Sequence, residues 1–269
     1  MTITKQKPKV KINFEEPHVV YRLKNGQTVV GVTTALGMLN KPALPVWGFN
    51  TGKEPRFKSI TEAAEFGNIN IKKLKKDDAV SWAFSVGQDR KYQSLYGNVD
   101  KAANIGTIAH AILNARENGQ EIDHTNISDD NWNFACECVK SHDKWFESMT
   151  IKTIFAEKEL VSELYLYGGK LDKYALVSGE KTLIDYKSGK DIYDEYFVQL
   201  SGYINLLIEN GYPVDRAIIV NMPKTKGDNF KIDSKSVTSL FEAGYFEKFL
   251  AARDVYYADK KIKAYKEVL

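Results

Sequence analysis

Three charged residues in the middle of the chain have the types and the spacing that phosphate chemistry requires. Asp172 follows the pair Gly168-Gly169, while Asp185 and Lys187 lie together at the end of the next apolar segment. Two carboxylates and one ammonium in this arrangement can hold a divalent cation and steer a water molecule toward phosphorus. The pattern therefore predicts hydrolysis of phosphodiester bonds.

The period of a β-strand predicts where these side chains point. Residues 182–186 are apolar and bounded by polar residues, which indicates a short strand. Alternate side chains of a strand share a face, so Asp185 and Lys187 should point the same way, about 7 Å apart. An antiparallel neighbour over residues 171–177 would bring Asp172 within ligand distance of Asp185. The alternative is an exposed Asp-Lys pair on a solvated strand, which contributes less than about 1 kcal/mol.

Two predicted helices add further polar groups. Residues 192–210 have the pattern of an amphipathic helix, on which Gln199 and Tyr203 share a face. Residues 100–118 predict another helix, with His110 beside its inward apolar stripe. An imidazole in that place can ligate a metal, although a lone helical histidine can equally be structural.

Five short blocks stand in chain order: Gly106-Thr107-Ile108-Ala109-His110, Phe155-Ala156-Glu157-Lys158, Gly169-Lys170-Leu171-Asp172, Asp185-Tyr186-Lys187, and Gln199 with Tyr203. Together they resemble the PD-(D/E)xK nuclease superfamily in its RecB-like branch of phage-type exonucleases. The leader around Val20-Tyr21-Arg22 and Gly31-Val32-Thr33-Thr34 is similar to that branch and to the mitochondrial genome maintenance exonucleases. Five ordered blocks are more specific than any single one.

The resemblance implies a metal site and a catalytic lysine. The implied metal ligands are His110, Asp172, Asp185 and the backbone carbonyl of Tyr186, around one or two Mg²⁺ or Mn²⁺ ions. Lys187 matches the lysine that orients the attacking water or stabilises charge on the phosphorane oxygens.

The resemblance also implies an acidic residue and a bracing pair. Glu157 matches an acidic position that precedes the two aspartates, and Glu159 and Glu163 remain alternatives for it. Gln199 and Tyr203 match a Gln-x-x-x-Tyr element that contacts DNA and braces the site.

The fold class expected from this reading is α/β, with a PD-(D/E)xK restriction-endonuclease-like core. Its mixed central sheet is flanked by helices, and an N-terminal hairpin and helical extension are added to it. The hairpin should cover residues 10–31 and turn at Asn25-Gly26. We expect residues 1–98 to form the hairpin and helical extension, packed on a nuclease core of residues 99–269. Beyond the strand over 182–187, further strands are expected at 153–161, 164–177, 216–221 and 229–232, and a closing helix at 237–263.

Aromatic residues in the expected helical extension are candidates for contact with nucleic acid. Trp47, Trp82 and Tyr96 could stack on unpaired bases, at about 1–3 kcal/mol for each base. The alternative is ordinary core packing, which large aromatic side chains also favour.

Composition limits the class of protein without selecting a function. The 269 residues are 43% hydrophobic, enough to bury a full core, and the net charge of +3 is too small to argue for nucleic acid by itself. No apolar run approaches the roughly 20 residues that span a bilayer, so we expect no membrane association and a cytoplasmic protein of a bacterial or phage-infected host cell.

The two cysteines, Cys136 and Cys138, point apart on a helix, which predicts no disulfide. They also cannot complete an iron–sulfur cluster of four cysteines.

The function expected from all of this is a metal-dependent DNA exonuclease acting in phage or cellular recombination, repair or replication. Its partners would be DNA, single-stranded or as a duplex with an end, and a single-strand annealing or binding protein. One alternative is a structure-specific or restriction-type endonuclease on the same fold. Another is a non-catalytic nucleic-acid-binding or regulatory protein.

Overall fold

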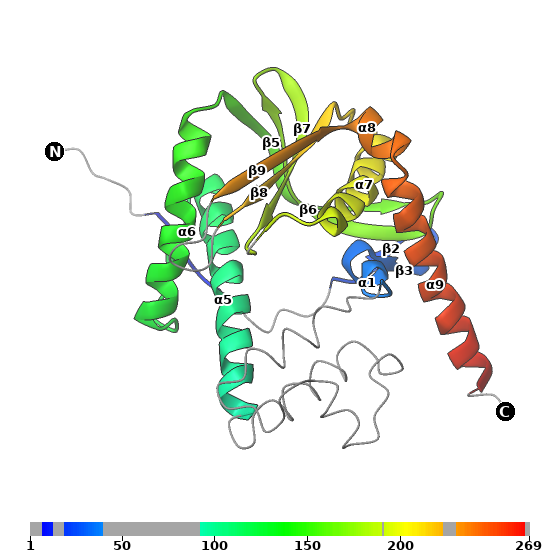
Figure 1. Cartoon of the computed structure of the whole chain (residues 1–269), viewed down its shortest axis with the longest axis horizontal. Helices are drawn as coiled ribbons and strands as arrows, with labels where there is room; N and C mark the ends of the chain where they lie inside the picture. The colour runs from blue at the N-terminus through cyan, green and yellow to red at the C-terminus, as the bar shows by residue number, and fades with distance from the viewer. Residues whose placement is uncertain (1–6, 13–18, 40–91, 190, 223–229, 267–269) are drawn as a thin grey trace, which may run out of the picture. The chain divides into compact units, whose positions relative to one another are not determined.

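A computed structural model describes residues 7–12, 19–39, 92–189, 191–222 and 230–266 (Figure 1). The chain divides into two compact units, one formed by residues 1–38 with 104–269 and the other by residues 39–103. The first unit contains the sheet and the candidate site. Trp47 and Trp82 lie outside the described residues, as does the side chain of Tyr96, so their stacking role stays a prediction. The division expected near residue 98 also stays a prediction.

The first unit is built on a seven-stranded sheet in which parallel and antiparallel pairs are mixed. The parallel pairs are β3 with β6 and β7 with β8, and the other neighbours run antiparallel. In spatial order the strands are β2 (Tyr21–Arg22), β3 (Thr28–Gly31), β6 (Tyr167–Val177), β7 (Glu180–Lys187), β8 (Arg216–Asn221) and β9 (Lys231–Ser236), with β5 (Ile151–Ser162) also paired to β6.

Helices cover the two faces of this sheet and enclose two separate apolar cores (Figure 1). On one face, α5 (Tyr92–Glu117) and α6 (Asp129–Glu147) pack against the sheet through residues such as Ile108 and Val139. The opposite face is covered by α1 (Val32–Leu36), α7 (Asp194–Glu209), α8 (Val237–Glu242) and α9 (Tyr245–Lys266). The expected mixed sheet flanked by helices is therefore confirmed.

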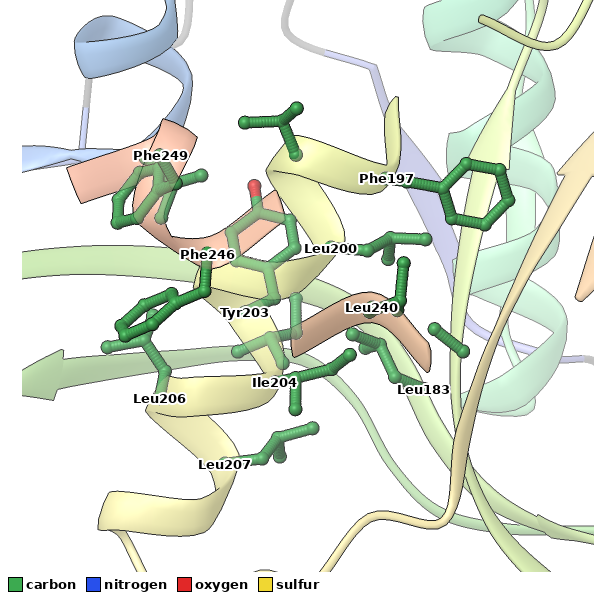
Figure 2. Close-up of a cluster of buried hydrophobic side chains, with 14 of the residues drawn as sticks. Leu183, Phe197, Leu200, Tyr203, Ile204, Leu206, Leu207, Leu240, Phe246 and Phe249 are labelled. Carbon is green, nitrogen blue, oxygen red and sulfur yellow. The ribbon is translucent and has the colours of Figure 1, made fainter. Parts of the chain in front are cut away.

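The core on the α7 face holds the helix that carries the Gln-x-x-x-Tyr element. Figure 2 shows Leu200, Tyr203 and Leu207 of α7 among the side chains of the neighbouring elements. Phe249 of α9 is fully buried there, and a Cβ added to Gly202 would lie 3.3 Å from its ring. This close packing fixes α7 against the sheet on one side and against α9 on the other.

Glycines allow an aromatic ring to cover one edge of the sheet. Gly31 and Gly168 are direct partners in the parallel β3–β6 pair. The ring of Tyr21 lies over both, because a Cβ on Gly168 would lie 2.4 Å from its Cγ and a Cβ on Gly31 would lie 2.9 Å from its Cε2. Any larger residue at either position would displace this ring.

The N-terminal hairpin differs from the one expected over residues 10–31. Within the described part of this range, the antiparallel pair joins Tyr21–Arg22 to Thr28–Gly31, around Gly26 with φ 85°. Lys9–Lys11 forms β1, which instead runs parallel to an unexpected strand β4 (Glu121–Asp123). A parallel partner far away in sequence leaves no local pattern, so the turn signal alone overestimated the length of the hairpin.

The closing helix expected over residues 237–263 is two helices. Helix α8 ends at Glu242 and α9 begins at Tyr245, and Gly244 between them has φ 81°. Glycine reaches this left-handed conformation without steric strain, so it ends one helix and redirects the chain. The short strand expected at 229–232 is β9, Lys231–Ser236.

Helix α6 carries both cysteines, and each is a free thiol. Cys138 is buried in the core, whereas Cys136 is half-buried. Across the described ranges, no helix combines the length and the apolar character needed to cross a bilayer.

Candidate active site

The two aspartates meet where strands β6 and β7 stop pairing. Their antiparallel register ends at Lys173 opposite Ile184, one position before Asp172 and Asp185. Beyond this point the backbone N–H of Tyr186 donates a 2.8 Å hydrogen bond to Oδ2 of Asp172. The carboxylate of Asp172 thus accepts a hydrogen bond from the backbone of the neighbouring strand. The predicted proximity of Asp172 to the Asp185-Lys187 segment is present in the structure.

Lys187 neutralises Asp185 in a mostly buried ion pair. The ammonium Nζ contacts Oδ2 of Asp185, and the two side chains are 17% and 2% exposed. The same Oδ2 atom has no partner with hydrogen-bond geometry, so this contact is an ion pair without a well-formed hydrogen bond. Burying a carboxylate is costly unless a positive group compensates it, and the ammonium of Lys187 does so here.

Burial and neighbouring charges shift the pKa values of Asp172, Asp185 and His110. Burial raises the pKa of Asp172 and that of Asp185 to about 6, against the lowering effect of Lys187, and the charge of Asp172 adds to the shift of Asp185. Burial, followed by the charge of Lys187, lowers the pKa of His110. Near neutral pH the site therefore combines a neutral imidazole with two carboxylates that one ammonium compensates incompletely.

His110 reaches the aspartates from α5. Its Nδ1 lies 3.8 Å from Oδ2 of Asp172, and its side chain is 30% exposed. The ring packs edge-on against Tyr186, with centroids 5.9 Å apart. Buried Ile108, Ala109 and Ile112 hold this part of α5 on the sheet, so the imidazole faces Asp172 because its helix is anchored there.

Glu157 is the glutamate of the three alternatives that lies closest to this group. It stands on β5 between the residues that pair with Leu171 and Lys173, and so faces Asp172. Its φ of 53° is unusual for a residue with a side chain and marks a local irregularity of the strand. Its Oε2 lies 2.6 Å from Nζ of Lys170.

The other two glutamates lie elsewhere. Glu163 accepts a 2.8 Å hydrogen bond from the backbone N–H of Lys24. The charge of Glu159 helps to raise the pKa of Tyr21, after the larger effect of burial.

A cleft of about 250 Å³ opens beside His110. Glu157 and Lys170 line one side of it, and Thr107 and Asn114 of α5 line another. A larger hollow of about 430 Å³ lies around Trp132 and Cys136, and none of the predicted site residues lines it.

Gln199 and Tyr203 lie together on one face of α7, as the helix spacing predicted. Nε2 of Gln199 donates a 3.0 Å hydrogen bond to the Tyr203 hydroxyl. Tyr203 is buried, and its pKa is raised first by burial and then by the charge of Asp185. The ring fits because Gly169 has no side chain, since a Cβ there would lie 2.6 Å from Cε1 of Tyr203.

Three supporting residues were not recognised in the sequence. The ring of Tyr196 lies below Lys187, with Nζ 5.4 Å from its centroid, and its spacing from Gln199 and Tyr203 on α7 was an available signal. Lys173, which is 2% exposed, forms an ion pair with Glu117 and so ties β6 to α5 beside Asp172. Asn221 is hydrogen-bonded to Gly189 after β7. Neither Lys173 nor Asn221 has a distinctive local sequence pattern.

The donor set suits a hard divalent cation, although it is not a finished coordination shell. Two carboxylates, a neutral imidazole and the carbonyl of Tyr186 are oxygen and nitrogen donors that such ions accept. Among the residues that the structure describes, no group of three or more His, Cys, Asp or Glu side chains is gathered closely enough to hold a metal. The agreement therefore lies in donor type and in the charge of two carboxylates set against one ammonium.

Asp172→Asn should stabilise the metal-free protein at alkaline pH. Because the pKa of Asp172 is raised in the fold, its contribution to stability is present below the ordinary pKa of about 4 and is lost as the pH rises through about 6. An asparagine oxygen can still accept from Tyr186, while the charge is removed. We expect a gain on the order of 1–2 kcal/mol at pH 8 and a smaller gain at pH 5, measured by urea unfolding in EDTA.

The exposed Asp259 on α9 provides the control for this measurement. Asp259→Asn should leave the free energy of unfolding unchanged at both pH values. A loss of stability at pH 8 in Asp172→Asn would contradict the cost of placing this charge in a site shielded from solvent.

Comparison with known proteins gives remote similarities. No family model matches the chain, and no curated protein matches its sequence significantly. Among solved structures, SSO0001 is 13% identical with a TM-score of 0.28, and the match covers 45% of this chain and 61% of that protein. The match thus spans less than two thirds of SSO0001.

Another similar structure is an alkaline exonuclease of Laribacter hongkongensis, LHK-Exo. It is 14% identical with a TM-score of 0.31, and the match covers 62% of this chain and 91% of that one. Its complex with dAMP is 16% identical with the same TM-score and coverage.

Proposed function

We propose that this protein is a metal-dependent deoxyribonuclease that hydrolyses phosphodiester bonds from DNA ends, in recombination, repair or replication. The observation that carries the proposal is the pair of neighbouring aspartates, the buried Asp185 with Lys187 against it and the half-buried Asp172 with His110 near it. A pair of carboxylates this poorly compensated is unfavourable for stability, and such arrangements are concentrated at functional sites.

Asp172, Asp185 and His110 would hold the ion, together with the carbonyl of Tyr186. When bound, Mg²⁺ or Mn²⁺ would supply compensating charge and a water molecule of lowered pKa. Glu157 faces Asp172 across the β5–β6 pair and could contribute a further oxygen.

Lys187 has a separate role in the proposed reaction. Its ammonium lies between the buried carboxylate of Asp185 and the ring of Tyr196. From this position it can donate to an attacking water or to a phosphate oxygen on which negative charge develops. Gln199 and Tyr203 brace the adjoining face of the site through their hydrogen bond.

Ended and circular DNA separate the proposed exonuclease from the endonuclease alternative. We expect 5′- and 3′-labelled oligonucleotides to be degraded in Mg²⁺ or Mn²⁺ and to remain intact in EDTA. Covalently closed circular DNA should survive under the same conditions. The label that is released first gives the polarity, and paired single- and double-stranded substrates give the preferred form.

Other outcomes identify the alternatives. Cutting of closed circles would make the protein an endonuclease. Cleavage that persists in EDTA would exclude the metal-dependent mechanism. Absence of cleavage, with no heat of Mn²⁺ binding in calorimetry, would favour a non-catalytic DNA-binding protein.

A further inference from the structure

An exposed tyrosine stands at the end of the loop that follows the catalytic strand. Tyr193 precedes the first residue of α7 and is 48% exposed. Single exposed aromatic side chains are common on protein surfaces, so exposure alone has no functional meaning. The surroundings of this ring distinguish it from the others.

Gly189 and Asp191, in the segment that leads to Tyr193, make specific contacts. Asn221 of β8 accepts a 3.0 Å hydrogen bond from the N–H of Gly189 and donates another of 3.0 Å to its carbonyl. Asp191 forms a 2.7 Å ion pair with Lys231 of β9 and also accepts from the N–H of Ile192. The carbonyl of Tyr193 itself accepts from the N–H of Tyr196. A ring on such a loop loses little further freedom when it binds a ligand.

A continuous series of contacts connects the ring of Tyr193 to Lys187 and Asp185. Tyr193 packs edge-on against Tyr196, with centroids 5.6 Å apart. Tyr196 in turn lies below the ammonium of Lys187, which contacts Asp185. The ring of Tyr193 is therefore supported from the side of the catalytic lysine and exposed on the side open to solvent.

We propose that Tyr193 is a stacking platform for an unpaired base of the substrate strand, close to the bond that is cleaved. The inference depends on the proposed nuclease function and adds to it a substrate contact, namely a base in single-stranded form. A tyrosine ring stacks on every base with little sequence preference, as an enzyme that degrades DNA of any sequence requires. Tyr196 would act as a positioning residue that supports both Tyr193 and Lys187.

The test measures binding and cleavage with bases removed one at a time. Single-stranded oligonucleotides would each carry one abasic residue at one of the first few positions from either end. We expect Tyr193→Ala to weaken the binding of intact DNA in EDTA by about 5- to 150-fold. It should raise KM in Mg²⁺ to a similar extent, with a smaller effect on kcat. At one abasic position the variant and the wild type should bind equally, because the stacked base is already absent.

Matched variants separate stacking from a structural effect. Tyr193→Trp and Tyr193→Phe keep a flat ring and should bind like the wild type. Tyr265→Ala, which removes an exposed tyrosine of α9, should leave affinity unchanged. An equal loss for Tyr193→Ala at every abasic position, or no loss on intact DNA, would overturn the proposal.

The two proposals can fail separately. If the wild type binds DNA but does not cleave it, the position-specific loss in EDTA would still establish stacking, and only the nuclease function would be rejected. If the wild type cleaves DNA and Tyr193→Ala is indistinguishable from it on all substrates, only the platform would be rejected.

Discussion

Asp185→Asn and Lys187→Ala are each expected to reduce DNA hydrolysis by at least about 100-fold, with the larger loss in Asp185→Asn. Uncatalysed phosphodiester cleavage is so slow that an enzyme must lower the barrier by upward of ~20 kcal/mol. Removing one group that stabilises developing charge usually lowers kcat by about 10²–10³. Asp185→Asn also removes a proposed metal ligand. Single-turnover rates on a labelled single strand in Mg²⁺ measure both effects.

Controls on the same strand make this result specific. Lys181 is an exposed lysine of β7, and Lys181→Ala should retain the wild-type rate. Both active-site variants should still bind DNA in EDTA, which anisotropy can measure, because neither change disrupts the surface that binds the strand. Undiminished hydrolysis by Asp185→Asn or Lys187→Ala would refute the assignment of the site.

Gly169→Val is expected to destabilise the fold by about 3 kcal/mol and to reduce activity in the fraction that remains folded. A Cβ at this position would already lie 2.6 Å from Tyr203 and 3.0 Å from Leu206. Both side chains belong to the packed core around α7 and cannot withdraw, so the new methyl groups cause overpacking. The displaced ring would also lose its hydrogen bond from Gln199. Urea unfolding measures the loss of stability. The cleavage rate, divided by the fraction of protein that is folded, measures the loss of activity.

Tyr203, which the new side chain at position 169 would contact, provides the control for this substitution. Tyr203→Ala removes the ring, and in that background Gly169→Val should destabilise the protein less than it does in the wild type, with the contact to Leu206 remaining. Additive losses in the double variant would show that the ring does not limit the residue at position 169.

Local patterns in the sequence were sufficient to predict the strands and helices that carry the site. Strand Arg216–Asn221 has the expected bounds, and α7 begins and ends within two residues of the expected helix. Both segments are strongly periodic or strongly apolar, which is the condition under which sequence patterns are most informative. The β1–β4 and β3–β6 pairs were not predictable, because parallel partners far apart in sequence share no turn.

The composition of the site was easier to predict than its contacts. The period of a strand placed Asp185 and Lys187 on one face, but it could not show that Lys187 neutralises Asp185. The spacing of helix α7 paired Gln199 with Tyr203, whereas the place of Tyr196 under Lys187 depends on how α7 packs on the sheet. The irregular backbone of Glu157 also has no signature, because it follows from tertiary packing.

The pairing of β3 with β6 at Gly31 and Gly168, beneath the ring of Tyr21, affects how this protein can be shortened. Strand β3 pairs with β6 at Tyr167 and Gly168, before the β6–β7 pairing begins. Deleting the first 31 residues would uncover one side of this stretch of β6, which keeps β5 on its other side, and leave the backbone groups that face β3 without partners. Such an open strand is a template for association with other chains. A truncated form should therefore aggregate even though every residue of the proposed reaction is still present.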